Sequence, residues 1–445
     1  MVLAGLSVLL TILVWTKGLE ESFDRPSVTP KLSLHQSEIS LLAEPALPKE
    51  IKPVFLGKDP KETLKDLLVK IPADQITERE SFLLSVINIK DTNNLNMLDR
   101  TFDNDGFSQL KTRIFLAEKN KEKLSTKDLD EFRVLSKDPL LYRFVCLSFG
   151  SNDSQCIDYQ VSNSMAFRLI ISQSIPVLSA LFGSIFLLRQ IWIFFRTRNR
   201  KSASSIPDLP LSLIDMVLLV SGGFVVLGEV LFPTLIVPLS IYLTQSFASP
   251  IRESLRVFIG YSAMTLPPLF ILRSQLSYLK KSERPSDGWL QWKIFPLKTA
   301  VLDSVKGWLM VLPVVLLTGW LMNILVGDQG GSNPLLELVL QSKSPIALFF
   351  LVITTVILAP LFEELIFRGA LLPVLVREFG STVGVVVSAL AFALAHLSVG
   401  ELAPLFVLGV GLGLLRFSSG RLFPCVLMHS LWNGITFANL VLIGG

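Results

Sequence analysis

The chain has 445 residues, of which 50% are hydrophobic and only 18% are charged, and its formal net charge is +4. Soluble domains carry about 25% charged residues, so this composition excludes an ordinary soluble protein and favours one that is partly embedded in a membrane. A net charge this small gives no support for nucleic-acid binding.

The N-terminal third of the chain carries most of the charge. Residues 1–16, MVLAGLSVLLTILVWT, are apolar and predict either a membrane anchor or the core of a signal peptide. No small-residue cleavage site follows, which favours a retained anchor. Residues 17–165 predict a soluble, mostly helical domain outside the membrane. Within it, the proline-rich stretch 25–50 favours a linker, and this places His35 in solvent.

Helical patterns in this domain are local but clear. Four apolar residues share one helical face, namely Leu64, Leu67, Leu68 and Ile71. Thr77 and Glu80 have the spacing of a capping box, and residues 124–138 form a further amphipathic segment. Cys146 and Cys156 are ten positions apart, a spacing that leaves a disulfide and two free thiols equally open.

Residues 166–445 predict a polytopic membrane domain. Eight apolar segments are expected to cross or enter the bilayer: 169–195, 213–233, 253–272, 307–326, 345–362, 381–398, 402–417 and 421–443. Lys and Arg gather in alternate loops, among them 196–201 and the pair Arg416 and Arg421. The positive-inside rule then places the N-terminal domain on the non-cytoplasmic side, where a disulfide is favoured. The predicted fold class is therefore an all-α transmembrane bundle of about eight spans with a helical soluble domain.

Ionisable residues are few in the apolar last hundred residues, where an uncompensated charge is costly, and five of them stand in motif-like patterns. Glu364 and Arg368 are four positions apart, so they share a helical face and predict an ion pair. Glu363 is rotated about 100° from Glu364 around the helix, so its carboxylate points away from this pair and is free for another role. Two further segments each carry a histidine, and the residues that share a face there are Phe392 with His396 and His429 with Asn433.

These side chains suit the activation of water. A desolvated glutamate is a usable general base, and a neighbouring histidine can hold the same water. A second histidine and an amide can donate to a developing oxyanion. Hydrolysis of an amide bond within the membrane is the reaction class that they fit best.

The three motifs EELIFR, FALAH and HSLWN occur in this order and resemble those of the CPBP family of intramembrane proteases, which includes the CAAX prenyl endopeptidases. The resemblance covers about residues 340–440. It implies that Glu363 and His396 activate the water, that His429 and Asn433 form the oxyanion site, and that Glu364 and Arg368 support the structure. The substrate would be a membrane-embedded or lipidated protein or peptide.

Several alternatives stay open. Phe392 is a candidate for the substrate pocket, although packing is the commoner role of a phenylalanine. Zinc could be held by Glu363, His396 and His429, but the HExxH pattern is missing and Asn433 is a poor zinc ligand, so we favour chemistry without a metal. A transporter is a second possible function, because intramembrane ionisable residues also mark ion pathways. A third is a non-catalytic scaffold or immunity protein.

One difficulty concerns depth in the membrane. If the spans are straight, Glu363 lies near the inner end of its helix and His396 near the outer end of the next. Pro360 could break the helix there and bring the two side chains together. Glu229 is a further intramembrane acid to which the pattern assigns no role.

Overall fold

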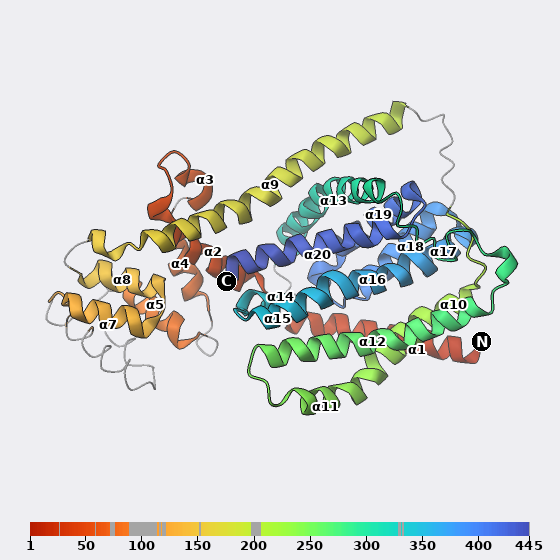
Figure 1. The fold of residues 1–445 in the computed structure, drawn as a ribbon, viewed down its shortest axis with the longest axis horizontal. Coiled ribbons are helices and arrows are strands. Elements are labelled where there is room, and N and C mark those ends of the chain that lie inside the picture. The colour runs from red at the N-terminus through yellow and green to blue at the C-terminus, as the bar shows by residue number, and fades with distance from the viewer. Residues whose placement is uncertain are drawn as a thin grey trace. The chain divides into compact units, whose positions relative to one another are not determined.

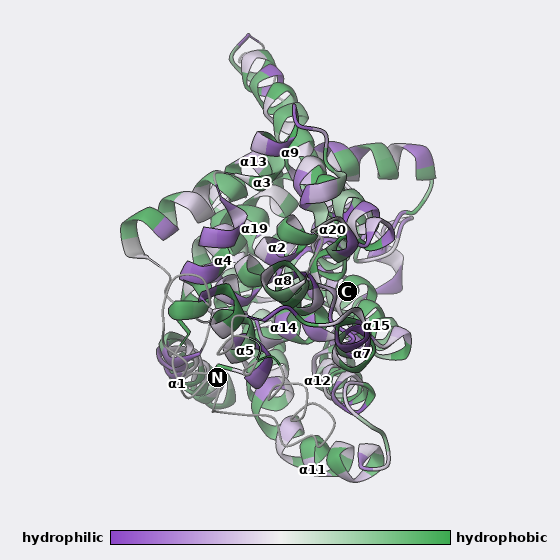
Figure 2. Ribbon diagram, turned by 90° about the vertical axis from the view of Figure 1, so that its left-hand side faces the viewer, coloured by the Kyte–Doolittle hydropathy of each residue, from purple (hydrophilic) through white to green (hydrophobic). Residues whose placement is uncertain are grey.

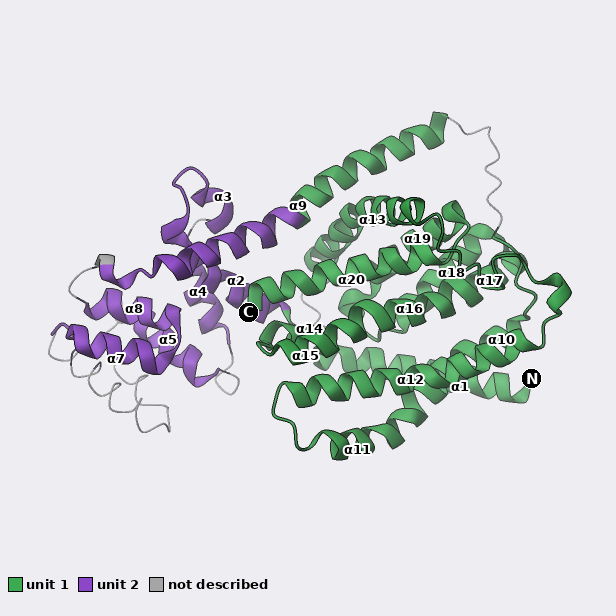
Figure 3. Ribbon diagram, viewed as in Figure 1, with its two compact units in different colours: residues 1–28, 176–445 green, residues 29–175 purple. Residues whose placement is uncertain are grey.

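The computed structural model describes residues 1–25, 27–57, 59–71, 76–88, 114, 117, 122–150, 153–196, 206–327, 331 and 333–444. These residues fold into helices and connecting turns and contain no strand. They divide into two compact units, residues 29–175 and residues 1–28 with 176–445 (Figure 3). The helix α9 (Tyr159–Arg196) runs from the first of these units into the second.

The unit of residues 29–175 is a helical domain with its own apolar core. Its helices are α2 (Thr29–Ala43), α3 (Lys52–Leu56), α4 (Pro60–Val69), α5 (Glu78–Asn88), α7 (Thr126–Ser136), α8 (Pro139–Phe149) and the start of α9 (Figure 1). Leu64 and Leu68 are fully buried in the core, and Leu67 and Ile71 pack against it, as their spacing predicted. The capping box is confirmed, because Thr77 N–H donates to Glu80 and Glu80 N–H to Thr77 Oγ1.

The predicted linker is wrong. Residues 29–43 form α2, and residues 44–46 form a short 3₁₀ turn. Pro30 and Pro45 lie in the first turns of these two elements, where a missing N–H costs nothing because no intrahelical partner exists there. His35 Nδ1 lies 2.9 Å from the carbonyl oxygen of Lys31 on the same helix.

Two ties hold this domain together beyond its core. Cys146 and Cys156 form a disulfide that joins the end of α8 to the turn before α9. Arg79 bonds Glu38 at 2.6 Å and Asp138 at 2.5 Å, and so links α5 to α2 and to the start of α8. Burial by itself lowers the pKa of Arg79, but its hydrogen bonds and ion pairs with these two carboxylates raise the pKa above its ordinary value.

The other unit holds the apolar helices. Among the described residues, eight helices are long and apolar enough to cross a membrane, and one of them, α9, begins in the unit of residues 29–175. They are Val2–Asp24 (α1), Tyr159–Arg196 (α9), Leu213–Thr244 (α10, η4 and α11), Ile251–Ser277 (α12), Leu297–Leu325 (within α13, Leu297–Val326), Pro345–Phe379 (α15, η6, α16, η7 and α17), Val399–Ser419 (α19) and Phe423–Gly444 (α20). Hydrophobic residues cover most of α11 (Phe232–Thr244), and Leu235 and Tyr242 on it are exposed (Figure 2). Such a surface suits contact with lipid.

The set of long helices differs from the predicted one in two places. The N-terminal helix α1 extends to Asp24 and packs against η4 (Leu218–Leu231), so it belongs to the bundle. The predicted span 381–398 is the short helix α18 (Ser381–Leu394), which has only 14 residues. The chain thus contains about as many long apolar helices as predicted, and α18 lies among them as a half-length element.

Pro360 does not break its helix. Residues 345–379 form one continuous helix that widens to π-helical turns at η6 (Ile353–Leu358) and η7 (Leu365–Leu371). Instead, the hairpin between α17 (Leu372–Phe379) and α18 places Glu363 and His396 at the same distance from its turn. Glu363 precedes Gly380 by 17 residues and His396 follows it by 16, so at about 1.5 Å per residue both lie about 25 Å from the turn.

Gly380 makes this hairpin turn possible. Its φ is +80°, a left-handed conformation that favours glycine. The hairpin continues into α19, where Gly409 lies so close to α18 that an added Cβ would be 3.0 Å from the Cα of Ala389. Small residues of this kind let membrane helices approach closely.

Candidate active site

A buried ion pair forms the base of the site. Arg368 Nη1 donates to Glu364 Oε1 at 2.9 Å, and neither side chain is exposed. Arg368 Nη2 donates to the carbonyl oxygen of Gly409, and the guanidinium lies 4.4 Å from the ring centre of Phe392. The predicted i, i+4 pair is therefore present, and it ties the Glu364 helix to α19 and α18.

His429, from α20 (Phe423–Gly444), lies between the two glutamates. Its Nδ1 is 2.9 Å from Glu364 Oε1, and its Nε2 is 3.8 Å from Glu363 Oε2. Because a carboxylate only accepts, Nδ1 carries the proton in the first contact. The imidazole is thus fixed with Nε2 towards Glu363.

His396 approaches Glu363 from the end of α18. Its Nδ1 lies 2.8 Å from the carbonyl oxygen of Phe392 and must donate to it, and its Nε2 is 4.0 Å from Glu363 Oε2. Glu363 Oε2 is itself buried and has no hydrogen-bond partner among the described residues. One unpartnered carboxylate oxygen therefore faces the Nε2 atoms of two imidazoles.

Asn433 is held by a carbonyl group that Pro360 leaves free. The η6 turn has π-helical bonding, in which the N–H of residue i donates to the carbonyl oxygen of residue i−5, as Ala359 does to Thr354. The next residue, Pro360, has no N–H to donate to Thr355. The Thr355 carbonyl oxygen instead accepts from Asn433 Nδ2 at 2.8 Å. Pro360 thus helps to place Asn433.

Pro373 has the same relation to η7. Leu372 N–H donates to Phe367, and Pro373 cannot donate to Arg368, whose carbonyl oxygen accepts from Arg416 Nε at 3.3 Å. Arg416 is fully buried in α19, so its prediction as a basic residue of a cytoplasmic loop is wrong. Arg421, the other residue of that pair, is 9% exposed and bonds Asp303 at 3.2 Å.

Phe392 packs against the site residues. Its ring is fully buried and makes edge contacts with His396 at 4.8 Å and with His429 at 5.6 Å between ring centres. It fixes the planes of both imidazoles in this way. Its role in a substrate pocket stays a prediction, because no part of the ring is exposed in this conformation.

Tyr261 is a site residue that the sequence patterns did not identify. It lies on α12 (Ile251–Ser277), and its hydroxyl group donates to Glu363 Oε1 at 3.1 Å. Glu229, the acid to which the sequence assigned no role, is close enough for its charge to act on Tyr261. Its Oε2 is buried and has no hydrogen-bond partner in the part of the chain that the structure describes. Tyr261 comes from a helix about 100 residues earlier in the chain, so only tertiary structure shows the contact.

We expect Tyr261→Phe to lower kcat. The variant removes the donor to Glu363 Oε1 and frees the carboxylate to rotate, and a hydrogen bond to a charged group contributes about 1.5–3 kcal/mol, or roughly 10- to 100-fold. KM should change little, since the hydroxyl group bonds Glu363 and is given no contact with the substrate. Tyr242→Phe, an exposed tyrosine on α11, is the control and should behave as the wild type. An unchanged kcat in Tyr261→Phe would show that this hydrogen bond does not orient the Glu363 carboxylate for cleavage.

The residues that could ligate zinc do not form a compact ligand group as they lie. Among the described residues, no group of three or more His, Cys, Asp and Glu side chains is placed to hold a metal ion. Tetrahedral zinc ligands at about 2.0–2.1 Å from the metal are about 3.3 Å apart, whereas Glu363 Oε2 is 3.8 and 4.0 Å from the two histidines. We therefore derive no step through a metal.

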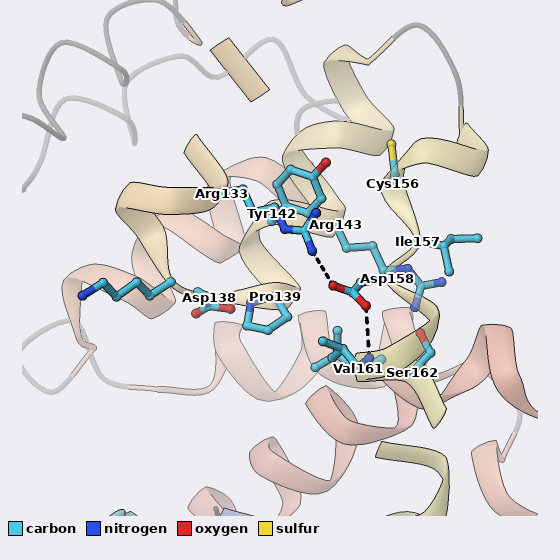
Figure 4. A pocket seen from close by; sticks show the side chains of 12 residues that line it. Arg133, Asp138, Pro139, Tyr142, Arg143, Cys156, Ile157, Asp158, Val161 and Ser162 are labelled. Carbon is cyan, nitrogen blue, oxygen red and sulfur yellow. Dashed lines mark hydrogen bonds and ion pairs between the residues drawn. The ribbon is translucent and has the colours of Figure 1, made fainter. Parts of the chain in front are cut away.

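A pocket of about 220 Å³ lies in the unit of residues 29–175, between α7, α8 and the start of α9 (Figure 4). Asp158 accepts a hydrogen bond from Arg133 Nη2. It also caps α9, because it accepts from the N–H groups of Gln160 and Val161. Asp138 caps α8 and binds Arg79. Both carboxylates of this pocket are thus engaged within the domain, and we assign them a structural role.

Comparisons with known proteins divide the chain in a similar way. Residues 345–435 match the profile of the family described as type II CAAX prenyl endopeptidase Rce1-like, and residues 29–167 match that of a domain of unknown function, DUF8675. Neither the curated proteins nor the solved structures gave a match. The first match contains all three motifs and every residue of the Glu363 site except Tyr261. This multi-pass membrane chain therefore carries, at residues 345–435, a domain that matches the Rce1-like CAAX prenyl endopeptidases, and this match supports a protease of the CAAX type.

Proposed function

We propose that the chain is an intramembrane endopeptidase in which Glu363 and His396 activate a water molecule. The observation that carries this proposal is the buried, unpartnered Glu363 Oε2, which faces the Nε2 atoms of His396 and His429. Polar atoms separated by more than about 3.5 Å are often bridged by water. Such a water would donate one proton to Glu363 Oε2 and the other to His396 Nε2, and would turn its lone pair towards a scissile carbonyl carbon.

His429 is given the role of a donor at the reaction centre. Its Nδ1–H is held by Glu364 Oε1, and its Nε2 lies 3.8 Å from Glu363 Oε2. Donation from Nε2 to a developing oxyanion requires a proton on that atom as well.

The reaction follows from these roles. Attack by the water oxygen transfers its proton to Glu363 and forms a tetrahedral intermediate with a negative oxygen. His429 Nε2–H and the second N–H of the Asn433 amide would donate to that oxygen, each donor contributing on the order of 3 kcal/mol. Glu363 then returns the proton to the leaving amine as the C–N bond breaks.

The substrate class that we propose is a lipidated or membrane-embedded peptide, because the site lies in apolar helices and the matched family is described by prenylated CAAX substrates. A farnesylated peptide with a CAAX end, offered to the full chain in liposomes, tests this directly. We expect release of the terminal tripeptide, little release from the same peptide without the farnesyl group, and no loss of activity with a chelator. Activity lost in chelator and restored by zinc would establish the zinc-dependent alternative, with Glu363, His396 and His429 as ligands.

We also propose that the domain of residues 29–175 faces the non-cytoplasmic side. Disulfides persist in oxidising compartments, and Cys146 and Cys156 are bonded. In membranes isolated without reductant, we expect a denaturing alkylation to label neither cysteine until a reductant is added. Cys425, which is a free thiol, should be labelled in both conditions and serves as the control. Labelling of Cys146 and Cys156 without reductant would contradict this orientation.

A further inference from the structure

The end of helix α1 holds the turn that follows His396. Arg25 Nη2 donates to the carbonyl oxygen of Leu397 and lies 3.5 Å from that of Gly18. The N–H of Val399 donates to Ser22 Oγ at 3.0 Å, and Ser22 is fully buried. Ser22 of the N-terminal helix and Arg25, the residue directly after that helix, thus bond the backbone on both sides of Ser398.

This turn has a backbone conformation that needs support. Leu397, the residue directly after His396, has a φ of +50°, a left-handed conformation that is uncommon and unfavourable for a branched side chain. Gly18 packs closely over it, since an added Cβ there would lie 2.9 Å from Leu397 Cδ1. The contacts from α1 therefore stabilise a strained residue next to a histidine of the site.

The same contacts bear on the direction of the His396 ring. The ring is held on one side by the bond from Nδ1 to Phe392, and its backbone continues directly into Leu397. Glu401, the first acidic residue of α19, is close enough for the charges of both His396 and Arg25 to act on it. Release of Leu397 would leave the position of His396 Nε2, now 4.0 Å from Glu363, less well defined.

We propose that α1 is retained in the mature protein as part of the protease and that Arg25 is a positioning residue for His396. The inference rests on the proposed function of Glu363 and His396. It assigns the N-terminal apolar segment to a membrane helix that supports the site, and not to a removable signal. Helix α1 and Arg25 lie outside residues 345–435, so this support comes from outside the matched family domain.

The test compares four variants of the full chain with a cleaved peptide as readout. Arg25→Ala should lower kcat roughly 10- to 100-fold with little change in KM, because a small misplacement of a catalytic group has effects of this size. Arg25→Lys should recover part of the loss, and Ser22→Ala should show a milder loss in kcat. Lys17→Ala is the matched control, since Lys17 is exposed on the same helix, and it should match the wild type.

Two further measurements keep the outcome clear. The mass of the purified protein should include residues 1–24, and a mature chain without them would overturn the proposal. If Arg25→Ala does not fold, Ser22→Ala decides, and wild-type kcat in that folded variant would also overturn it. Glu363→Gln is run beside them: if it is inactive while Arg25→Ala and Ser22→Ala are fully active, only this inference fails. If Glu363→Gln is active, the proposed function fails.

Discussion

Glu363→Gln is expected to lower kcat by about 10³-fold or more, because general base catalysis contributes roughly 10²- to 10⁴-fold and no other carboxylate in the cluster can replace it. Glu364 is held by both Arg368 and His429. The amide keeps the size of the side chain and can still accept from Tyr261, so KM and stability should change little. Peptide cleavage under single-turnover conditions is the measurement.

The control for this variant lies on the same helix. Glu378 lies 15 residues after Glu363, next to the end of the helix at Phe379, and is part-exposed and paired with the adjacent Arg377. Glu378→Gln should cleave at the wild-type rate. Cleavage by Glu363→Gln at a rate comparable to the wild type would rule out Glu363 as the base.

Arg368→Met is expected to destabilise the protein by about 3–5 kcal/mol, because it leaves the carboxylate of Glu364 buried without its guanidinium partner. It also removes the donor to Gly409 and the cation over Phe392. Unfolding in a titration with SDS, followed by the fluorescence of the tryptophans in the bundle, measures the change.

The double variant Glu364→Gln with Arg368→Met separates the charge from the packing. Removing both charges should recover a large part of the lost stability, since a neutral amide is far cheaper to bury than an unpaired carboxylate. Lys280→Met, in an exposed ion pair, should cost less than about 1 kcal/mol and is the control. If Arg368→Met costs no more than Lys280→Met, the pair does not support the site.

Local spacing predicted the contacts that lie within one helix. Glu364 and Arg368 pair because residues four apart share a face, and the capping box of Thr77 and Glu80 depends only on its own four residues. The membrane character of the chain follows equally directly from long apolar runs. These features need no knowledge of how helices meet.

Contacts between helices could not be predicted in this way. Tyr261 reaches Glu363, and Arg25 reaches Leu397, from helices far away in the sequence. Two predictions that relied on prolines, a linker at residues 25–50 and a helix break at Pro360, were wrong because the effect of a proline depends on its position. Pro30 is tolerated in a first turn, and Pro360 follows a π-helical turn whose free carbonyl oxygen is used by Asn433.

Hydrolysis by the chain can be tested without assuming a substrate, by following labelled water into the product. Membranes containing the wild-type chain or Glu363→Gln are incubated in water labelled with ¹⁸O, and the peptides of their membrane proteins are compared by mass spectrometry. We expect new carboxyl ends that carry a single ¹⁸O atom with the wild type and are missing with Glu363→Gln. Identical peptides from the two samples, with no new labelled ends, would contradict hydrolysis by a water that Glu363 activates.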